Sequence, residues 1–126
     1  MIELVAIVDD DDIFQFTTKV KLEKMGLAKD VKIFNDGEEI FDYLEAASLN
    51  DVPNVLLLDI NMPIVDGWDF LDLYANLASD KQNKISIYMI SSSINPVDVE
   101  KAKKHEHIID YITKPIKESD MLRIFK

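Results

Sequence analysis

The chain has 126 residues, 48% of them hydrophobic, which suffices for one domain with a buried core, expected to span residues 1–126, and is too short for two ordinary domains. Its 24 acidic and 14 basic residues give a net charge of −10, which disfavours binding to nucleic acid or to an anionic membrane and favours protein and cation partners. The absence of cysteine excludes disulfides and zinc-thiolate sites, and without a basic leader or a long apolar segment the chain is expected to be cytoplasmic.

Five short apolar runs alternate with longer amphipathic stretches along the chain. In order, the expected strands cover residues 4–8, 31–34, 55–58, 85–90 and 108–112. The first, third and fourth runs are nearly continuous in apolar residues, as in strands that are buried on both faces. This alternation predicts an α/β domain, (βα)5, with a parallel sheet covered by helices on both sides.

The first three helices are predicted from apolar residues at helical spacing. Their expected buried faces are Ile13, Phe16 and Val20; Ile40, Phe41, Leu44 and Ala47; and Trp68, Leu71, Ala75 and Ala78. Gly26 is expected to end the first helix, and the turn Asn35-Asp36-Gly37 precedes the second.

The last two helices have weaker signals. Asn95 followed by Pro96 predicts an N-cap and a first turn for a helix that runs to residue 104. The apolar face of this helix is thin, with Val99 and Ala102 and with Val97 as a further candidate, so the helix is expected to be weakly anchored. Ser119 or Asp120 is expected to cap a short final helix.

Polar residues follow four of the five predicted strands at the edge where parallel sheets gather their functional groups. They are Asp9 and Asp10 after the first strand, Asp59 and Asn61 after the third, Ser91 after the fourth, and Lys114 after the fifth. If the first and third strands are neighbours, three carboxylates lie close together and need a cation. A site with several carboxylates and few other protein ligands favours Mg2+, which keeps positions open for phosphate oxygens.

These groups suit phosphoryl transfer. Asp59 would act as the nucleophile and form an acyl phosphate, while the Lys114 ammonium offsets negative charge. The Ser91 hydroxyl is suited to donate a hydrogen bond to a phosphoryl oxygen.

Motifs in this order extend over essentially the whole chain. They are Val8-Asp9-Asp10, Asp36-Gly37, Leu58-Asp59-Ile60-Asn61-Met62-Pro63, Asp66-Gly67, Ile90-Ser91-Ser92, and Tyr111 with Lys114-Pro115. Together they make the chain resemble the receiver domain of bacterial two-component response regulators. The resemblance implies a flavodoxin-like, CheY-like fold, a doubly wound five-stranded parallel sheet with strand order 2-1-3-4-5.

The resemblance also implies a role for each acidic residue of the site. Asp59 matches the phosphoacceptor. Asp10 and Asp59 match residues that coordinate Mg2+ together with the backbone carbonyl of Asn61, and Asp9 matches a residue that holds a metal-bound water.

The switch residues are likewise implied by the resemblance. Ser91 occupies the switch position, and Tyr111 matches an aromatic residue that reorients when the hydroxyl moves toward the phosphate. Lys114 matches the lysine that pairs with the phosphorylated site, and its bond to Pro115 is expected to be cis. The conformational change is expected in residues 95–112, and the side chains at Asn61 and Ser93 are expected to influence the lifetime of the acyl phosphate.

A member of this family would receive a phosphoryl group from a sensor histidine kinase or a histidine phosphotransfer domain. It would then act through a downstream protein target, as a monomer or as a phosphorylation-dependent dimer, and would catalyse only its own phosphorylation and dephosphorylation.

Two other functions stay open from the residues. A phosphohydrolase with an aspartyl nucleophile generally needs a second aspartate two residues later, where this chain has Asn61. A pseudo-receiver would keep the fold as a binding module without phosphorylation. His105 and His107 are expected to be solvated and are assigned no role.

Overall fold

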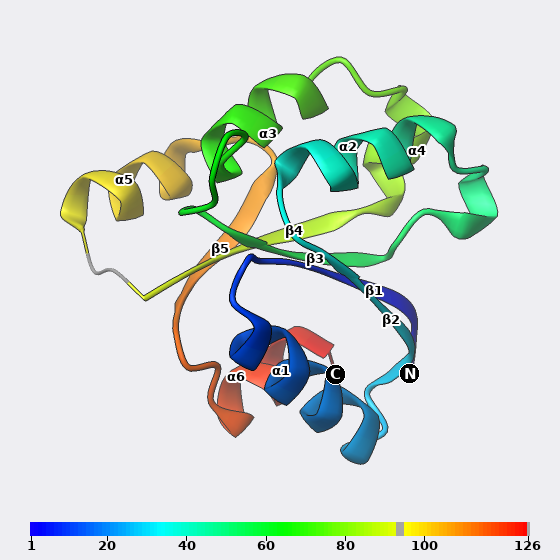
Figure 1. Ribbon diagram of the computed structural model, residues 1–126, viewed down its shortest axis with the longest axis vertical. Helices are drawn as coiled ribbons and strands as arrows, with labels where there is room; N and C mark the ends of the chain where they lie inside the picture. Colours follow the sequence, from blue (N-terminus) through cyan, green and yellow to red (C-terminus); the bar gives the residue numbers. More distant parts are fainter. Residues whose placement is uncertain (93–94, 126) are drawn as a thin grey trace.

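The computed structural model describes residues 1–92 and 95–125 and contains a five-stranded parallel sheet. The strands are β1 (Ile2–Val8), β2 (Ala28–Phe34), β3 (Val55–Asp59), β4 (Ser86–Ser91) and β5 (Ile108–Thr113). They pair in the order β2-β1-β3-β4-β5, and every pair is parallel (Figure 1). The predicted fold class and strand order are therefore confirmed, and the real strands differ from the expected ones by a few residues at their ends.

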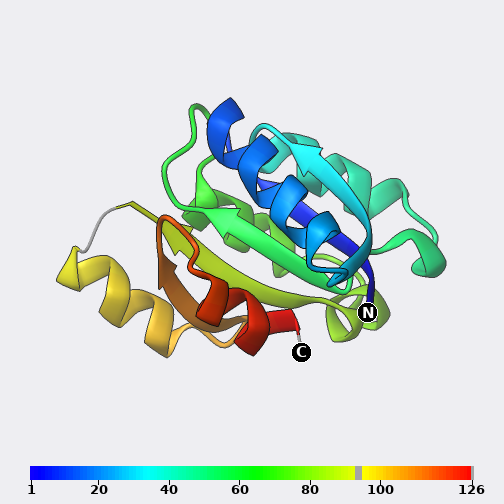
Figure 2. The same cartoon turned by 90° about the horizontal axis from the view of Figure 1, so that it is seen from below.

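The described residues also form six α-helices and one short 3-10 helix. They are α1 (Asp12–Lys24), α2 (Gly37–Ala46), η1 (Leu49–Asp51), α3 (Gly67–Tyr74), α4 (Ser79–Lys84), α5 (Pro96–Lys104) and α6 (Glu118–Phe125). Helices α2, α3, α4 and α5 cover one face of the sheet, while α1 and α6 cover the other (Figures 1 and 2). The sheet is thus enclosed on both sides, as the apolar runs indicated.

Two hydrophobic cores lie on the two faces of the sheet. In the central strands Ala6, Val8, Leu56 and Leu58 belong to the core beneath α2 and α3. The alternate residues Val5, Ile7, Val55 and Leu57 belong to the core beneath α1 and α6. Because successive side chains of a strand point to opposite faces, these runs must be apolar at every position.

The expected buried face of α1 is wrong. Ile13 and Phe16 are 76% and 68% exposed, whereas Phe14 and Leu22 are buried. The buried stripe also contains two polar residues, Gln15 and Thr18, so hydrophobic periodicity favoured the opposite face.

The predicted buried face agrees with the structure for α2 but not for the end of the α3 segment. Ile40 and Leu44 of α2 are fully buried, as predicted. Beyond α3, by contrast, Ala75 and Ala78 are exposed, and Tyr74 and Leu77 point into the core instead. Larger apolar side chains therefore define the buried face of this segment.

Helix α4 was not predicted. Its sequence contains no apolar residue, and none of its residues is buried. The side-chain amide of Gln82 holds it against the end of α3 by donating to the carbonyl oxygens of Tyr74 and Leu77 at 2.8 and 2.9 Å.

Three predicted helix ends can be compared with the structure. Asn95 caps α5 by accepting a hydrogen bond from the Val97 N–H, and Gly26 follows α1 with a φ of +64°. The expected cap of α6 is wrong, because the helix starts at Glu118 and Asp120 lies within its first turn. The Asp120 carboxylate accepts instead from the backbone N–H of Lys117.

Helix α5 is weakly packed, as predicted. Ala102 is its one buried residue in the described chain. Trp68 of α3 also holds this helix: its indole N–H donates to Asp98 at 3.3 Å, and its ring lies 4.4 Å from the Lys101 ammonium.

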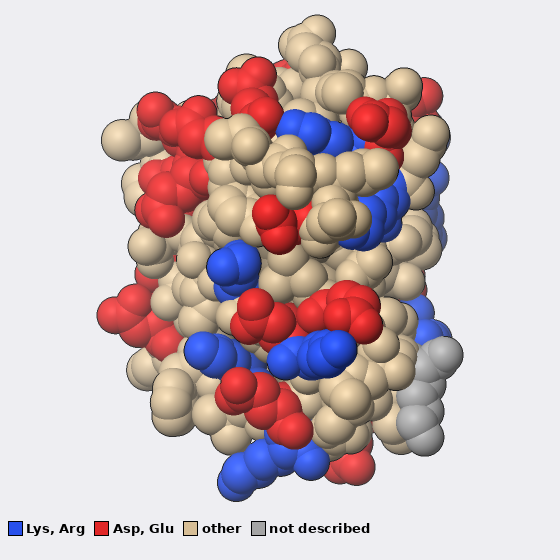
Figure 3. Space-filling view, turned by 90° about the vertical axis from the view of Figure 1, so that its right-hand side faces the viewer, with Lys and Arg blue, Asp and Glu red and all other residues tan. Residues whose placement is uncertain are grey.

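Acidic and basic side chains alternate on the side of the molecule where the strands begin (Figure 3). The ion pair between Lys29 and Glu3, at 3.6 Å, belongs to this end of the sheet. The described residues on this side therefore form no uniformly basic patch that would suit nucleic acid. Among the described helices, none combines the length and apolar content needed to cross a bilayer.

Candidate functional site

Asp9 and Asp59 reach the same side of the sheet. Asp59 follows Val55 and Leu57 at alternate positions of β3, and Asp9 continues the alternation of Val5 and Ile7 beyond β1. Both carboxylates are buried, and one oxygen from each lies within 4.8 Å of an oxygen of the exposed Asp10. The structure thus brings together the three predicted carboxylates.

The loop after β3 folds back onto the strand end. The N–H of Gly67 donates to the carbonyl oxygen of Ile60 at 2.9 Å, and a Cβ atom at Gly67 would lie 2.5 Å from the Asp59 carbonyl oxygen. Only glycine allows this approach. Asp66 then caps α3 and forms a capping box with Asp69.

Ile64 lies at the tip of this loop in a conformation that β-branched residues avoid. Its φ is +68°, and its side chain is 89% exposed, so no packing compensates for the strained backbone. The loop therefore carries a local energetic cost beside the site.

The loop after β1 is organised by its own aspartates. Asp9 Oδ1 accepts a hydrogen bond from the N–H of Asp11 at 2.9 Å. Asp11 in turn caps α1 by accepting from the N–H groups of Ile13 and Phe14. Asp11 is therefore the N-cap of α1, and Asp12 is the first residue of the helix.

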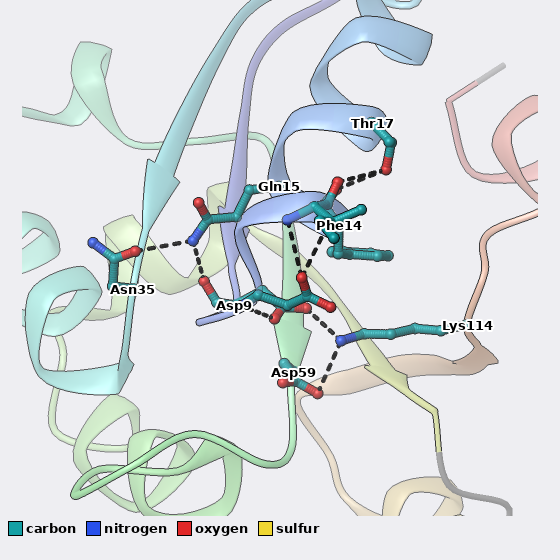
Figure 4. A network of polar contacts seen from close by, with 9 residues as sticks. Asp9, Phe14, Gln15, Thr17, Asn35, Asp59 and Lys114 are labelled. Carbon is teal, nitrogen blue, oxygen red and sulfur yellow. Dashed lines mark hydrogen bonds and ion pairs between the residues drawn. The ribbon is translucent and has the colours of Figure 1, made fainter.

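Lys114 lies between the two buried carboxylates (Figure 4). Its Nζ atom is 2.6 Å from Asp9 Oδ2 and 3.7 Å from Asp59 Oδ1. The ammonium also lies 4.5 Å from the ring centroid of Phe14. The bond between Lys114 and Pro115 is cis, as expected.

The buried carboxylates are difficult to ionise. Burial raises the pKa of Asp59 to about 6, and the neighbouring charge of Asp9 adds to this effect, while Lys114 and the backbone N–H of Asn61 oppose it. Burial also raises the pKa of Asp9, against the stabilising hydrogen bond from Lys114. One ammonium therefore does not compensate for three clustered carboxylates.

The cluster fits a hard divalent cation. Each carboxylate offers an oxygen to a common position, and Asp9 Oδ2 is buried with the Lys114 ammonium as its close partner. Oxygen ligands of this kind suit Mg2+, Ca2+ or Mn2+ rather than softer metals.

The remaining predicted site residues lie around this cluster. Asn61 is in the loop after β3, with its backbone N–H directed at the Asp59 carboxylate. Ser91 is the fully buried last residue of β4, and its carbonyl oxygen accepts from the Lys114 N–H at 2.8 Å. Tyr111 is half-buried on β5, opposite Met89. Ser93 lies outside the described residues.

Gln15 lies beside the site, which the sequence did not reveal. Its buried amide nitrogen donates to the carbonyl oxygen of Asp9 and to Asn35 Oδ1 (Figure 4). The available signal was a polar residue on the same side of α1 as Phe14 and Leu22, which periodicity had assigned to solvent.

The two histidines are not fully solvated. Their rings lie 5.7 Å apart, and the His107 ring packs against Tyr74 at 5.1 Å. His105 lies 6.4 Å from the Trp68 ring. The turn between α5 and β5 places both residues against α3, which corrects the expectation.

Comparisons with known proteins agree with this arrangement. The family model of the response regulator receiver domain matches residues 5–126. A response regulator receiver protein from Dyadobacter fermentans is 32% identical with a TM-score of 0.87, and the alignment covers 97% of this chain and 94% of that one. A two-component response regulator from Cytophaga hutchinsonii is 27% identical with a TM-score of 0.84, covering 98% and 94%.

A similar segment also occurs inside a much longer protein. The hybrid signal transduction histidine kinase I of Dictyostelium discoideum is 28% identical over 113 residues, which are 89% of this chain and 6% of that protein. The family match, the sheet order and the clustered carboxylates lead to one conclusion: the chain belongs to the response regulator receiver domains, the signalling domains of two-component systems.

Proposed function

We propose that residues 1–126 form one receiver domain that accepts a phosphoryl group on Asp59 from a sensor histidine kinase or a histidine phosphotransfer domain. The observation that carries this proposal is the position of Asp59. It is buried beside Asp9, in reach of an exposed third carboxylate, with the Lys114 ammonium 3.7 Å away.

In the proposed reaction an oxygen of Asp59 attacks phosphorus. The bond between phosphorus and the donor histidine nitrogen breaks, the imidazole leaves with the bonding electrons, and an acyl phosphate remains on Asp59. Lys114 offsets negative charge on the carboxylate and on the transferred group.

Mg2+ is the proposed cofactor. Asp9, Asp10 and Asp59 would hold it together with the backbone carbonyl of Asn61, and when bound it would neutralise charge on the phosphoryl oxygens. The cluster of carboxylate oxygens within 4.8 Å supports this assignment.

The proposed output is a change in protein contacts. Ser91 would donate a hydrogen bond to the new phosphoryl group, and its backbone already bonds to that of Lys114. Movement there would reach α5, which follows β4 and buries one residue in the described chain, Ala102. A downstream protein would bind the surface formed by α5 and Tyr111 and so distinguish the two states. The receiver would act in the cytoplasm as a monomer or as a phosphorylation-dependent dimer.

The phosphodonor is proposed to contact the exposed face of α1. Ile13 and Phe16 form an apolar surface on the turns next to the capping residue Asp11, close to the acidic cluster. Phe16→Ser should slow transfer from a purified phosphotransfer domain and leave labelling by acetyl phosphate unchanged. An equal loss with both donors would argue against this surface.

The proposed activity is limited to the receiver's own phosphorylation and dephosphorylation. Asn61 stands where an aspartyl phosphohydrolase generally needs an acid, which disfavours turnover of small substrates. The alternative is a pseudo-receiver, a binding module with the fold but without phosphorylation.

Intact mass spectrometry after incubation with acetyl phosphate distinguishes the two. The wild type should gain the mass of one phosphoryl group in the presence of Mg2+ and lose it with hydroxylamine, whereas Asp59→Asn should gain nothing. Asp69→Asn, a change in the exposed first turn of α3, serves as the control that keeps the adduct. An unmodified wild type would favour the pseudo-receiver.

A further inference from the structure

Gln15 is buried in the first turns of α1, and no step of the proposed phosphorylation uses it. Its Nε2 atom donates one N–H to the backbone carbonyl oxygen of Asp9 and the other to Oδ1 of Asn35, at 2.9 Å. Because a carbonyl oxygen only accepts hydrogen bonds, the atom facing Asp9 must be the amide nitrogen. Figure 4 shows this nitrogen between the two acceptors.

The carbonyl of Asp9 needs this donor because the sheet ends there. The N–H of Asp9 still donates to the carbonyl oxygen of Phe34 at 3.0 Å, continuing the pairing of β1 with β2. Val8, however, is the last residue of β1. A buried carbonyl left without a partner costs about 1–3 kcal/mol, and Gln15 takes the place of the missing strand neighbour.

The same hydrogen bond controls the direction of Asp10. The carbonyl oxygen of Asp9 and the nitrogen and Cα atoms of Asp10 lie in one peptide plane. Fixing the oxygen fixes that plane, and with it the position from which the Asp10 side chain starts. Asp10 is exposed, and among the described residues its carboxylate forms no side-chain hydrogen bond or ion pair.

We infer that Gln15 is a positioning residue for the acidic cluster. By holding the peptide between Asp9 and Asp10 against Asn35, it keeps the Asp10 carboxylate close to those of Asp9 and Asp59, and so sets the affinity of the site for a divalent cation. This inference rests on the proposed function. Partners that orient metal ligands typically change metal affinity by about 10- to 100-fold when removed.

Isothermal titration with Mg2+ tests the inference without any phosphorylation. Gln15→Met keeps the length of the side chain and removes both donors, and it should raise the Mg2+ dissociation constant about tenfold or more. Thr18→Val is the matched control, because it also replaces a buried polar residue of α1 with an apolar one. It should bind Mg2+ within about twofold of the wild type.

The rate of labelling by acetyl phosphate separates positioning from general damage. In Gln15→Met the Mg2+ concentration for half-maximal rate should rise, while the rate at saturating Mg2+ returns close to that of the wild type. Gln15→Glu, which keeps size and polarity but lacks the amide donors, should show the same shift and serves if the methionine variant does not fold.

An unchanged Mg2+ dissociation constant in both Gln15 variants would overturn the inference and leave Gln15 a purely structural residue. So would an equal weakening in Thr18→Val. If the wild type itself neither binds Mg2+ nor is labelled, the proposed function fails instead, and the two failures are thereby distinguished.

Discussion

The Lys114 ammonium lies closer to Asp9 than to Asp59, at 2.6 Å against 3.7 Å. Lys114 is largely buried, and Asp9 is almost completely so. The lysine is therefore the main compensation for a carboxylate that belongs to the cation cluster, and it is also in reach of the proposed phosphoacceptor.

Replacing Lys114 should destabilise the fold, because the buried Asp9 carboxylate then has no cationic partner. Lys114→Met is expected to lower the free energy of unfolding by about 3 kcal/mol at pH 8, because it leaves a buried charge unpaired. The loss should be smaller at pH 5, because burial raises the pKa of Asp9 and removing the Lys114 hydrogen bond raises it further, so a lower pH favours the neutral carboxyl. Urea unfolding in EDTA measures both values. Lys117→Met, at an exposed position, should change neither, and an equal loss at both pH values would contradict the charge-pairing explanation.

Neutralising the phosphoacceptor should stabilise the metal-free protein. Because the pKa of Asp59 is raised to about 6, the folded state binds more protons than the unfolded chain between about pH 4 and 6, and the free energy of unfolding falls as pH rises through this range. Asp59→Asn removes this penalty. Its advantage over the wild type should appear above about pH 4 and level off above about pH 6, at up to about 3 kcal/mol.

The comparison must be made by denaturant unfolding in EDTA, with Mg2+ added in a second series. Mg2+ should stabilise the wild type more than Asp59→Asn, since the variant lacks one anionic ligand. If the variant is less stable than the wild type at pH 8 in EDTA, burial of the ionised Asp59 carboxylate does not destabilise the fold.

At the strained loop tip, a smaller residue should increase stability. Ile64→Gly should raise the free energy of unfolding by about 1 kcal/mol, because glycine accepts a positive φ and the exposed side chain contributes no packing. Thermal unfolding measures the change. Ile64→Ala, which keeps a Cβ atom, should gain less, and a destabilised glycine variant would mean that the isoleucine makes a stabilising contact.

The local stability of helix α5 should depend on Trp68. Trp68→Phe removes the hydrogen bond to Asp98 and weakens the contact with Lys101, so hydrogen exchange in residues 97–104 should accelerate by about tenfold, which corresponds to about 1.4 kcal/mol. Exchange in β1 and β3 should change little. Asp98→Asn keeps an acceptor and is the control; uniform acceleration across the sheet would indicate loss of global stability instead.

Much of the fold was predictable because strands buried on both faces leave a clear apolar signature. The site was predictable for the same reason, since Asp9, Asp59 and Ser91 stand directly at the ends of such runs. Helix α4 left no comparable signal, because polar side chains hold it to its neighbours.

The face of α1 was mispredicted because burial there includes polar groups. Gln15 is buried to satisfy the carbonyl of Asp9 at the end of β1, a requirement that arises only when the strand stops. Ile13 and Phe16 then face outward despite their apolar side chains. Hydrophobic periodicity cannot identify a helix face that is chosen partly by hydrogen bonding.

Peptide mapping after borohydride reduction tests the central claim most directly, because borohydride converts an acyl phosphate of aspartate to homoserine. After incubation with acetyl phosphate and Mg2+, tandem mass spectrometry should find homoserine at position 59 and unmodified Asp9 and Asp10. Omitting Mg2+ should abolish the signal. Homoserine at position 9 or 10, or at no position, would contradict the assignment of Asp59 as the phosphoacceptor.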